Sequence, residues 1–273
     1  LFATSGDDCT IRVWDISARK MVKKIAVDTM VRAIDWSPDG ATIGAGMGGN
    51  VGKGRQKKDG AMLVISVDSM SVIHQARDSR EWISDVKFSP DGKSFAIGSN
   101  DNKIYVYDVM RDFALRAKCE KHHSYITHLD FSEDSNYIQS NCGGYELHFF
   151  NAIDGEHVHS PSTCKDVKWH TQTCTLGWYI QAIWPEYVDG VDILSTDRSS
   201  NNRFTSTTDS TGIVKVFRYP VLQKGVRSIT ARAHSSLCAK ARFNADDKYL
   251  ITIGGNDRTI LQWRVLTSST DSC

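Results

Sequence analysis

The feature that most constrains this chain is a short apolar strand that recurs six times. Three clear copies read "CTIRVWDI" (Cys9 to Ile16), "NKIYVYDV" (Asn102 to Val109) and "RTILQWRV" (Arg258 to Val265). The anchor positions of the six copies lie 51, 42, 43, 67 and 46 residues apart, at Trp14, Ile65, Tyr107, Phe150, Phe217 and Trp263. A repeat of about 40 to 45 residues is typical of a propeller blade with four strands.

A second strand, alternating apolar and polar residues, precedes most copies and usually ends in a Ser-Pro-Asp-Gly type turn. Its copies read "VRAIDWSPDG", "ISDVKFSPDG", "ITHLDFSEDS", "KDVKWHTQT" (Lys165 to Thr173) and "CAKARFNADD". The pattern predicts an all-β fold, a β-propeller over 1–273. We expect about six blades, the first and last incomplete, near residues 1–28, 29–78, 79–121, 122–161, 162–232 and 233–267.

Three repeats end in segments that resemble the WD-repeat family: "SGDDCTIRVWD", "GSNDNKIYVYD" and "GGNDRTILQW". In each, an aspartate stands six residues before the anchor. Histidines stand nine residues before two apolar strand ends. The family resemblance implies that such residues brace the blade, here Asp8, Asp101, Asp257, His122, His234, Trp14 and Trp263. A catalytic His-Asp interpretation is poor, because no nucleophile recurs beside them.

Two repeats exceed the period, and insertions in repeat proteins map to loops that often bind partners. One is a basic loop in "GMGGNVGKGRQKKDG", and the other is an aromatic-rich insertion within Cys164 to Ser200. The candidate partner-binding residues are Lys53, Arg55, Lys57, Lys58, Trp178, Trp184, Asp189 and Arg198. The alternatives are a solvated loop and aromatics that pack on their own blade.

Composition argues against disorder in the insertion, because disordered segments are poor in aromatic residues. We expect Thr173 to Ser200 to form an ordered cap over the fifth blade. Trp184-Pro185 would fix its bend and Asp189-Gly190 its turn.

Charge and cysteine content exclude several function classes. The chain has 33 basic and 32 acidic residues, a net charge of +1, so no overall field favours nucleic acid or a membrane. Its seven cysteines are scattered without a C-x-x-C pair, which predicts a reduced, cytoplasmic setting. No catalytic constellation or nucleotide motif stands out. Since neither "HH" (His122, His123) nor "HVH" (His157, His159) has a cysteine or carboxylate at ligand spacing, we expect no metal and no cofactor.

The insertion carries a more specific resemblance. Its run "LGWYIQAIWPEYVDGVDILSTDRSS", followed by "GIVKVFRYP", resembles the last part of the echinoderm microtubule-associated protein-like family. That resemblance covers nearly the whole chain and implies a non-enzymatic, cytoskeletal module that binds tubulin or microtubules. The chain would form most of the second propeller of a tandem pair, without the family's coiled coil, its amino-terminal basic region and its first propeller. The basic loop would face the acidic tails of tubulin. The alternative is a generic WD-repeat scaffold, such as a ubiquitin-ligase substrate receptor or a ciliary transport subunit.

Overall fold

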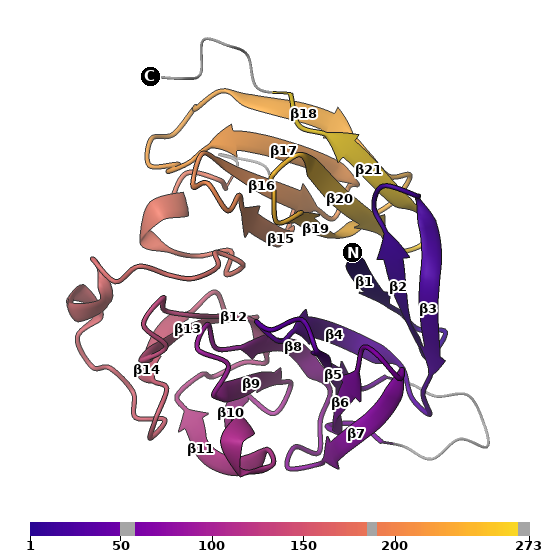
Figure 1. The fold of residues 1–273 in the computed structure, drawn as a ribbon. Helices are drawn as coiled ribbons and strands as arrows, with labels where there is room; N and C mark the ends of the chain where they lie inside the picture. Colours follow the sequence, from indigo (N-terminus) through magenta and orange to yellow (C-terminus); the bar gives the residue numbers. More distant parts are fainter. Residues whose placement is uncertain (50–57, 185–189, 267–273) are drawn as a thin grey trace. The chain divides into compact units, whose positions relative to one another are not determined.

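A computed structural model describes residues 1–49, 58–184 and 190–266 of the chain (Figure 1). The described residues form antiparallel sheets, and their only helices are three short 3₁₀ turns: η1 (Val109–Arg111), η2 (Pro161–Cys164) and η3 (Trp178–Ile180). The chain divides into two compact units, Leu1–His170 and Thr171–Cys273.

The first unit holds four sheets whose strands follow one another in chain order. The first sheet contains β1 (Phe2–Ser5), β2 (Thr10–Asp15) and β3 (Lys20–Ala26). The second contains β4 (Val31–Trp36), β5 (Thr42–Met47), β6 (Met62–Ser66) and β7 (Ser71–Ala76). The third contains β8 (Ile83–Phe88), β9 (Ser94–Ser99), β10 (Lys103–Asp108) and β11 (Ala114–Glu120). The fourth contains β12 (Ile126–Phe131), β13 (Tyr137–Cys142) and β14 (Leu147–Asn151).

The second unit holds two sheets of the same kind. One contains β15 (Ile193–Arg198), β16 (Phe204–Asp209), β17 (Ile213–Arg218) and β18 (Ser228–Arg232). The other contains β19 (Cys238–Phe243), β20 (Tyr249–Gly254) and β21 (Ile260–Arg264). These six sheets are the blades that the repeats predict.

The first and last blades are incomplete, as expected from the sequence, and blade four is incomplete as well. The anchor strand is third in the four-stranded blades, as β6, β10 and β17. It is second in the first sheet, as β2, so this blade lacks its innermost strand. In the sixth sheet the anchor strand is the third and last, β21, so the described residues, which end at 266, include no outermost strand for that blade. Blade four is also three-stranded, with only an isolated bridge between Phe150 and His157 in place of its outer strand.

A repeated turn closes the first hairpin of blades two to six. In blade three, the Ser89 hydroxyl donates to Asp91 at 2.6 Å, and Gly92 adopts a positive φ of 70°. The same hydroxyl accepts from the backbone N–H of Ser94 at 2.9 Å. Short polar side chains that bond to nearby backbone make such turns favourable. The hairpin register therefore follows from the Ser-Pro-Asp-Gly pattern.

Neighbouring inner strands are joined by an aspartate, which is buried at Asp85 and Asp197 and half-buried at Asp35. Asp35 of β4 accepts the backbone N–H of Phe88 in β8 at 2.7 Å, and Asp85 of β8 accepts that of Leu129 at 3.0 Å. In the second unit, Asp197 of β15 accepts the backbone N–H of Phe243 at 2.7 Å. Charge-assisted bonds of this kind are stronger than neutral ones, so each fixes one blade against the next.

One strand prediction is wrong. "KDVKWHTQT" does not form the inner strand of blade five, because Trp169 stacks on Phe149 of blade four at 5.7 Å and bridges to Ser132. The inner strand is β15, followed by the repeated turn in "RSSNN", where the backbone N–H of Phe204 donates to the Ser199 hydroxyl at 2.9 Å. The insertion therefore precedes blade five in the chain instead of interrupting it.

Two further features concern the whole described chain. No helix in the part that the structure describes is long and apolar enough to cross a membrane. The six described cysteines are buried, and none of them forms a disulfide bond with another described residue.

Candidate functional site

Blade six contains a complete brace made from the predicted residues. Nδ1 of His234 lies 3.0 Å from Oδ2 of Asp257, and Nε2 lies 3.0 Å from the hydroxyl of Thr252. The indole N–H of Trp263 donates to the same hydroxyl at 3.0 Å. Burial opposes ionisation of Asp257, but bonds from the backbone of Thr259 and from His234 outweigh it and lower the pKa. Every polar side-chain atom of His234 and Trp263 thus has a partner.

Blades one and three use parts of this brace. In blade one, the indole N–H of Trp14 donates to Thr4 at 2.8 Å, while Asp8 accepts from the hydroxyl of Thr10 at 2.7 Å. In blade three, Asp101 accepts from the Ser79 hydroxyl at 3.0 Å, so a serine stands where blade six has a histidine. The recurring aspartates therefore lie within hydrogen-bonded turns.

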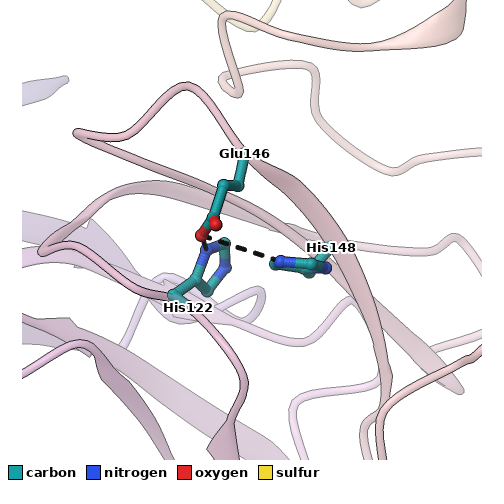
Figure 2. Close-up of side chains that lie close together, drawn as sticks. All are labelled: His122, Glu146 and His148. Atoms are coloured by element: carbon teal, nitrogen blue, oxygen red, sulfur yellow. Dashed lines mark ion pairs between the residues drawn. The ribbon is translucent and has the colours of Figure 1, made fainter.

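Blade four departs from the pattern. His122, between β11 and β12, faces a glutamate in the β13–β14 turn, Glu146, instead of an aspartate (Figure 2). A second imidazole, that of His148 in β14, faces the same carboxylate. Nδ1 of His122 and Nε2 of His148 lie 3.5 and 3.7 Å from Oε2 of Glu146. Both nitrogens are buried and make no hydrogen bond within the described residues. These three side chains are called the blade-four cluster.

Burial and neighbouring charge set the protonation of this cluster. Desolvation, with the nearby His148, lowers the pKa of His122 to about 4. Desolvation also lowers the pKa of His148. Hydrogen bonding from the His123 backbone, with help from the His123 and Cys142 side chains, lowers the pKa of Glu146 to about 2 against its partial burial. At neutral pH the cluster therefore presents two neutral imidazoles and one carboxylate.

Ligand spacing along the chain predicts no metal site here, because the three side chains come together only in the folded blade. Glu146 is distant from His122 in sequence, but the pairing of β13 with β12 and β14 brings their atoms together. The ligand atoms of His122, Glu146 and His148 all lie within 4.8 Å of one another. The available sequence signal is the pattern "E-x-H" in "YELHFF", which puts a carboxylate just before β14 and an imidazole two residues later, within the strand.

A family model for the second β-propeller of echinoderm microtubule-associated proteins matches residues 1–265. The chain belongs to this family. Echinoderm microtubule-associated protein-like 3 from Homo sapiens is 35% identical over 97% of this chain and 29% of its own length. The 77 kDa echinoderm microtubule-associated protein from Strongylocentrotus purpuratus is 34% identical over 97% of this chain and 38% of its own length. The chain thus spans roughly a third of these relatives.

A solved structure supports the fold class. A chain of the mitotic checkpoint complex matches with a TM-score of 0.73 and 16% identity, over 97% of this chain and 84% of that chain. At this identity the likeness concerns the fold alone. The WD-repeat propeller predicted from the repeats is confirmed, as is the family resemblance.

Most of the basic loop of this family member lies outside the described residues, including Lys53, Arg55 and Lys57. Lys58 is described, and its ammonium pairs with Asp28 at 2.5 Å. Asp59, which follows it, is buried and accepts the backbone N–H of Gly49 at 3.0 Å. Its carboxylate is therefore directed into the protein and away from the loop surface.

The described part of the insertion packs on blade five. Ile180 and Ile183 are buried in a cluster with Ile193, Phe217 and Val221, and Trp184 packs against this cluster. Backbone bonds tie the segment to the end of the blade, from Val221 N–H to the Tyr179 carbonyl at 2.8 Å and from Ala182 N–H to the Val221 carbonyl at 3.1 Å. Up to residue 184 the insertion is ordered, as the composition predicts.

The candidate partner residues of the insertion lie in different settings. The indole N–H of Trp184 donates to the Thr175 carbonyl at 3.0 Å, so its polar atom is used internally. Trp178 is half-buried at the start of η3. The Arg198 guanidinium lies 5.5 Å from the ring centre of Tyr219. Pro185 and Asp189, to which a bend and a turn were assigned, lie outside the described residues.

Proposed function

We propose that this chain is a non-enzymatic module of the microtubule cytoskeleton that presents propeller loops to tubulin or microtubules. The observation that carries the proposal is the match of residues 1–265 to the second propeller of a family whose members are named as microtubule-associated. In the longer protein this chain would be the second of two tandem propellers, in the cytoplasm.

The internal chemistry of the blades supports a binding role. The His, Asp and Trp side chains that recur in the repeats serve hydrogen bonds within their own blades, as at His234, Asp257 and Trp263. Such bonds make the blades a rigid scaffold, and binding of a partner is then expected at the loops that connect the strands.

The basic loop between β5 and β6 is the candidate docking point for an acidic partner. Its three cations at Lys53, Arg55 and Lys57 come from a chain that is otherwise nearly neutral. Nearby described cations are compensated, since Lys58 pairs with Asp28 and Arg32 pairs with Asp7 at 2.9 Å. The acidic carboxyl-terminal tails of tubulin have the complementary charge.

Tubulin binding by the whole chain is the test. We expect the chain to bind tubulin. The triple variant Lys53→Ser, Arg55→Ser, Lys57→Ser should bind more weakly, by up to about 100-fold, because exposed ion pairs contribute roughly 0 to 1 kcal/mol each. The difference should shrink at moderate salt and vanish with tail-cleaved tubulin. A matched control, Arg19→Ser, Lys20→Ser, Lys24→Ser, removes the same charge from exposed positions.

Two outcomes would overturn parts of the proposal. A folded chain that binds neither tubulin nor microtubules would contradict the function and favour a generic scaffold. Equal losses in the two triple variants would contradict the role of the loop while leaving tubulin binding to other surfaces.

A further inference from the structure

We propose that His122, Glu146 and His148 form a binding site for a divalent transition metal, with zinc as the metal that their chemistry suits. The ligand atoms would be Nδ1 of His122, Oε2 of Glu146 and Nε2 of His148. Zinc is commonly bound by imidazole nitrogen and carboxylate oxygen, and three protein ligands leave a fourth tetrahedral position for water or another ligand. Its residues are different from those proposed above to bind tubulin.

The distances suit this assignment. Bonds of about 2.1 Å in a tetrahedral centre place the ligand atoms roughly 3.4 Å apart. The two nitrogens lie 3.5 and 3.7 Å from Oε2 of Glu146. All three ligand atoms lie within 4.8 Å of one another, so a small movement of one imidazole would complete the centre. Figure 2 shows the carboxylate pointing toward both rings.

The free nitrogens are the observation that separates this cluster from an ordinary blade brace. Nδ1 of His122 and Nε2 of His148 are both buried without a hydrogen bond from or to a described residue. A buried polar atom left without a partner is costly. In blade six the corresponding nitrogen of His234 is hydrogen-bonded at 3.0 Å, and a metal would have to break that bond.

The far atom of each proposed ligand is already held in place. Nε2 of His122 lies 2.6 Å from the Ser140 hydroxyl, and Nδ1 of His148 lies 3.2 Å from Nε2 of His157. Oε1 of Glu146 lies 2.7 Å from Nδ1 of His123. Ligating histidines almost always use their other nitrogen in this way, which fixes the ring and its tautomer. The tautomers that fit carry the proton on Nε2 of His122 and on Nδ1 of His148, leaving the inner nitrogens free.

One contact would change on binding. The Cys142 thiol donates to Oε2 of Glu146 at 3.2 Å, as does the His123 backbone N–H at 3.0 Å. A metal on Oε2 would replace the weak thiol donor and keep the backbone bond. The Cys142 thiol is not one of the three ligand atoms that lie within 4.8 Å of one another, so we assign it no bond to the metal.

The test is titration of the metal-free chain with Zn²⁺ and Co²⁺, followed by calorimetry and by visible absorption. We expect one ion per chain at this site, a rise in melting temperature that saturates with it, and a tetrahedral Co²⁺ spectrum. Glu146→Gln and His148→Gln should each weaken binding by more than about 100-fold. Ser140→Ala, which releases the far nitrogen of His122, should weaken it by about 10- to 100-fold. The control His159→Ala removes a nearby exposed imidazole and should bind like the wild type.

The proposal has clear contrary outcomes. It is overturned if folded wild type binds neither ion, or if Glu146→Gln and His148→Gln retain wild-type affinity. A strong sulfur-to-cobalt band in the near ultraviolet would place the ion on a cysteine and also overturn it. The test uses Glu146 and His148 because their side chains are partly exposed, so their variants should keep the fold. The His122 side chain is fully buried, and its variant is not needed.

Discussion

Blade six and blade four use a histidine at the same place in the repeat but surround it differently. His234 in blade six bonds to Asp257 and Thr252 at 3.0 Å, so both of its nitrogens have partners. His122 in blade four bonds to Ser140 at 2.6 Å, but its other nitrogen lies 3.5 Å from Glu146 and shares that carboxylate with His148. The anchor residue also differs, because Phe150 replaces Trp263 and has no N–H to donate.

The same position in the repeat can therefore hold a histidine with both nitrogens hydrogen-bonded in one blade and a histidine with one buried nitrogen unpartnered in another. In blade four the acidic residue is the longer Glu146, two residues nearer the anchor than Asp257 in blade six, and it makes no hydrogen bond to Nδ1 of His122. A histidine two residues further along the strand then fills the face beside it. The blade-four cluster stands where blade six has its brace, but two of its nitrogens lack hydrogen bonds.

The largest expected effect is on the stability of blade six. His234→Ala should lower the free energy of unfolding by about 3 kcal/mol, because it removes a fully buried imidazole and leaves the Thr252 hydroxyl short of a partner. His122→Ala, measured without metal, should cost about 2 kcal/mol, because it also removes a fully buried imidazole but breaks a single hydrogen bond, the one to Ser140. Denaturant unfolding of both variants measures the two values. Equal costs would mean that the two histidines do the same work.

Blade five tests whether a packed insertion can take the place of a histidine brace. Trp184→Ala should cost about 2 kcal/mol, because this half-buried indole packs on the blade-five cluster and donates to Thr175. Thermal unfolding compares it with Gln181→Ala, an exposed neighbour. If both variants melt like the wild type, the insertion does not brace the blade.

A smaller effect should appear in the pH dependence of the metal-free chain. The folded-state pKa of His122 is lowered to about 4 from its ordinary 6.5, so the unfolded chain binds more protons between these values. Stability should therefore fall as the pH drops from 6.5 toward 4. Glu146, with a folded-state pKa lowered to about 2 from 4.5, adds a further loss below pH 4.5.

The variant His122→Gln isolates the histidine part of that dependence. It should show a flatter fall in stability between pH 6.5 and 4, although His148 and His157, whose pKa values are also lowered, still contribute. Urea unfolding at fixed pH values measures the slope. A His122→Gln slope as steep as that of the wild type would contradict the assignment of a neutral buried imidazole.

The sequence is sufficient for the fold because the blade signal is local and repeated. The strand alternation, the polar turns and the anchor residues all act over a few neighbouring positions, as in the turn at Ser89 to Gly92. The same locality explains the wrong strand at Lys165 to Thr173. Apolar and polar residues alternate in that segment as in a strand, but its Trp169 packs on Phe149 of blade four. Short alternating segments cannot reveal which sheet they join.

The blade-four cluster could not be predicted for a different reason. His122 and Glu146 are brought together by the pairing of β12 with β13 and of β13 with β14, and a scan for closely spaced ligands does not include such pairs. Whether the two nitrogens are buried and lack hydrogen bonds depends on side-chain positions, which residue spacing in the sequence does not determine. In contrast, the braces of blades one, three and six are predictable, because the aspartate stands six residues before the anchor residue in each of these repeats.

The most direct test of the contrast between the two blades is anomalous diffraction at the zinc edge from crystals of the chain grown with zinc. We expect an anomalous peak between His122, Glu146 and His148 and none between His234 and Asp257. A zinc-saturated crystal without a peak in blade four, or with the ion at His234 instead, would contradict it.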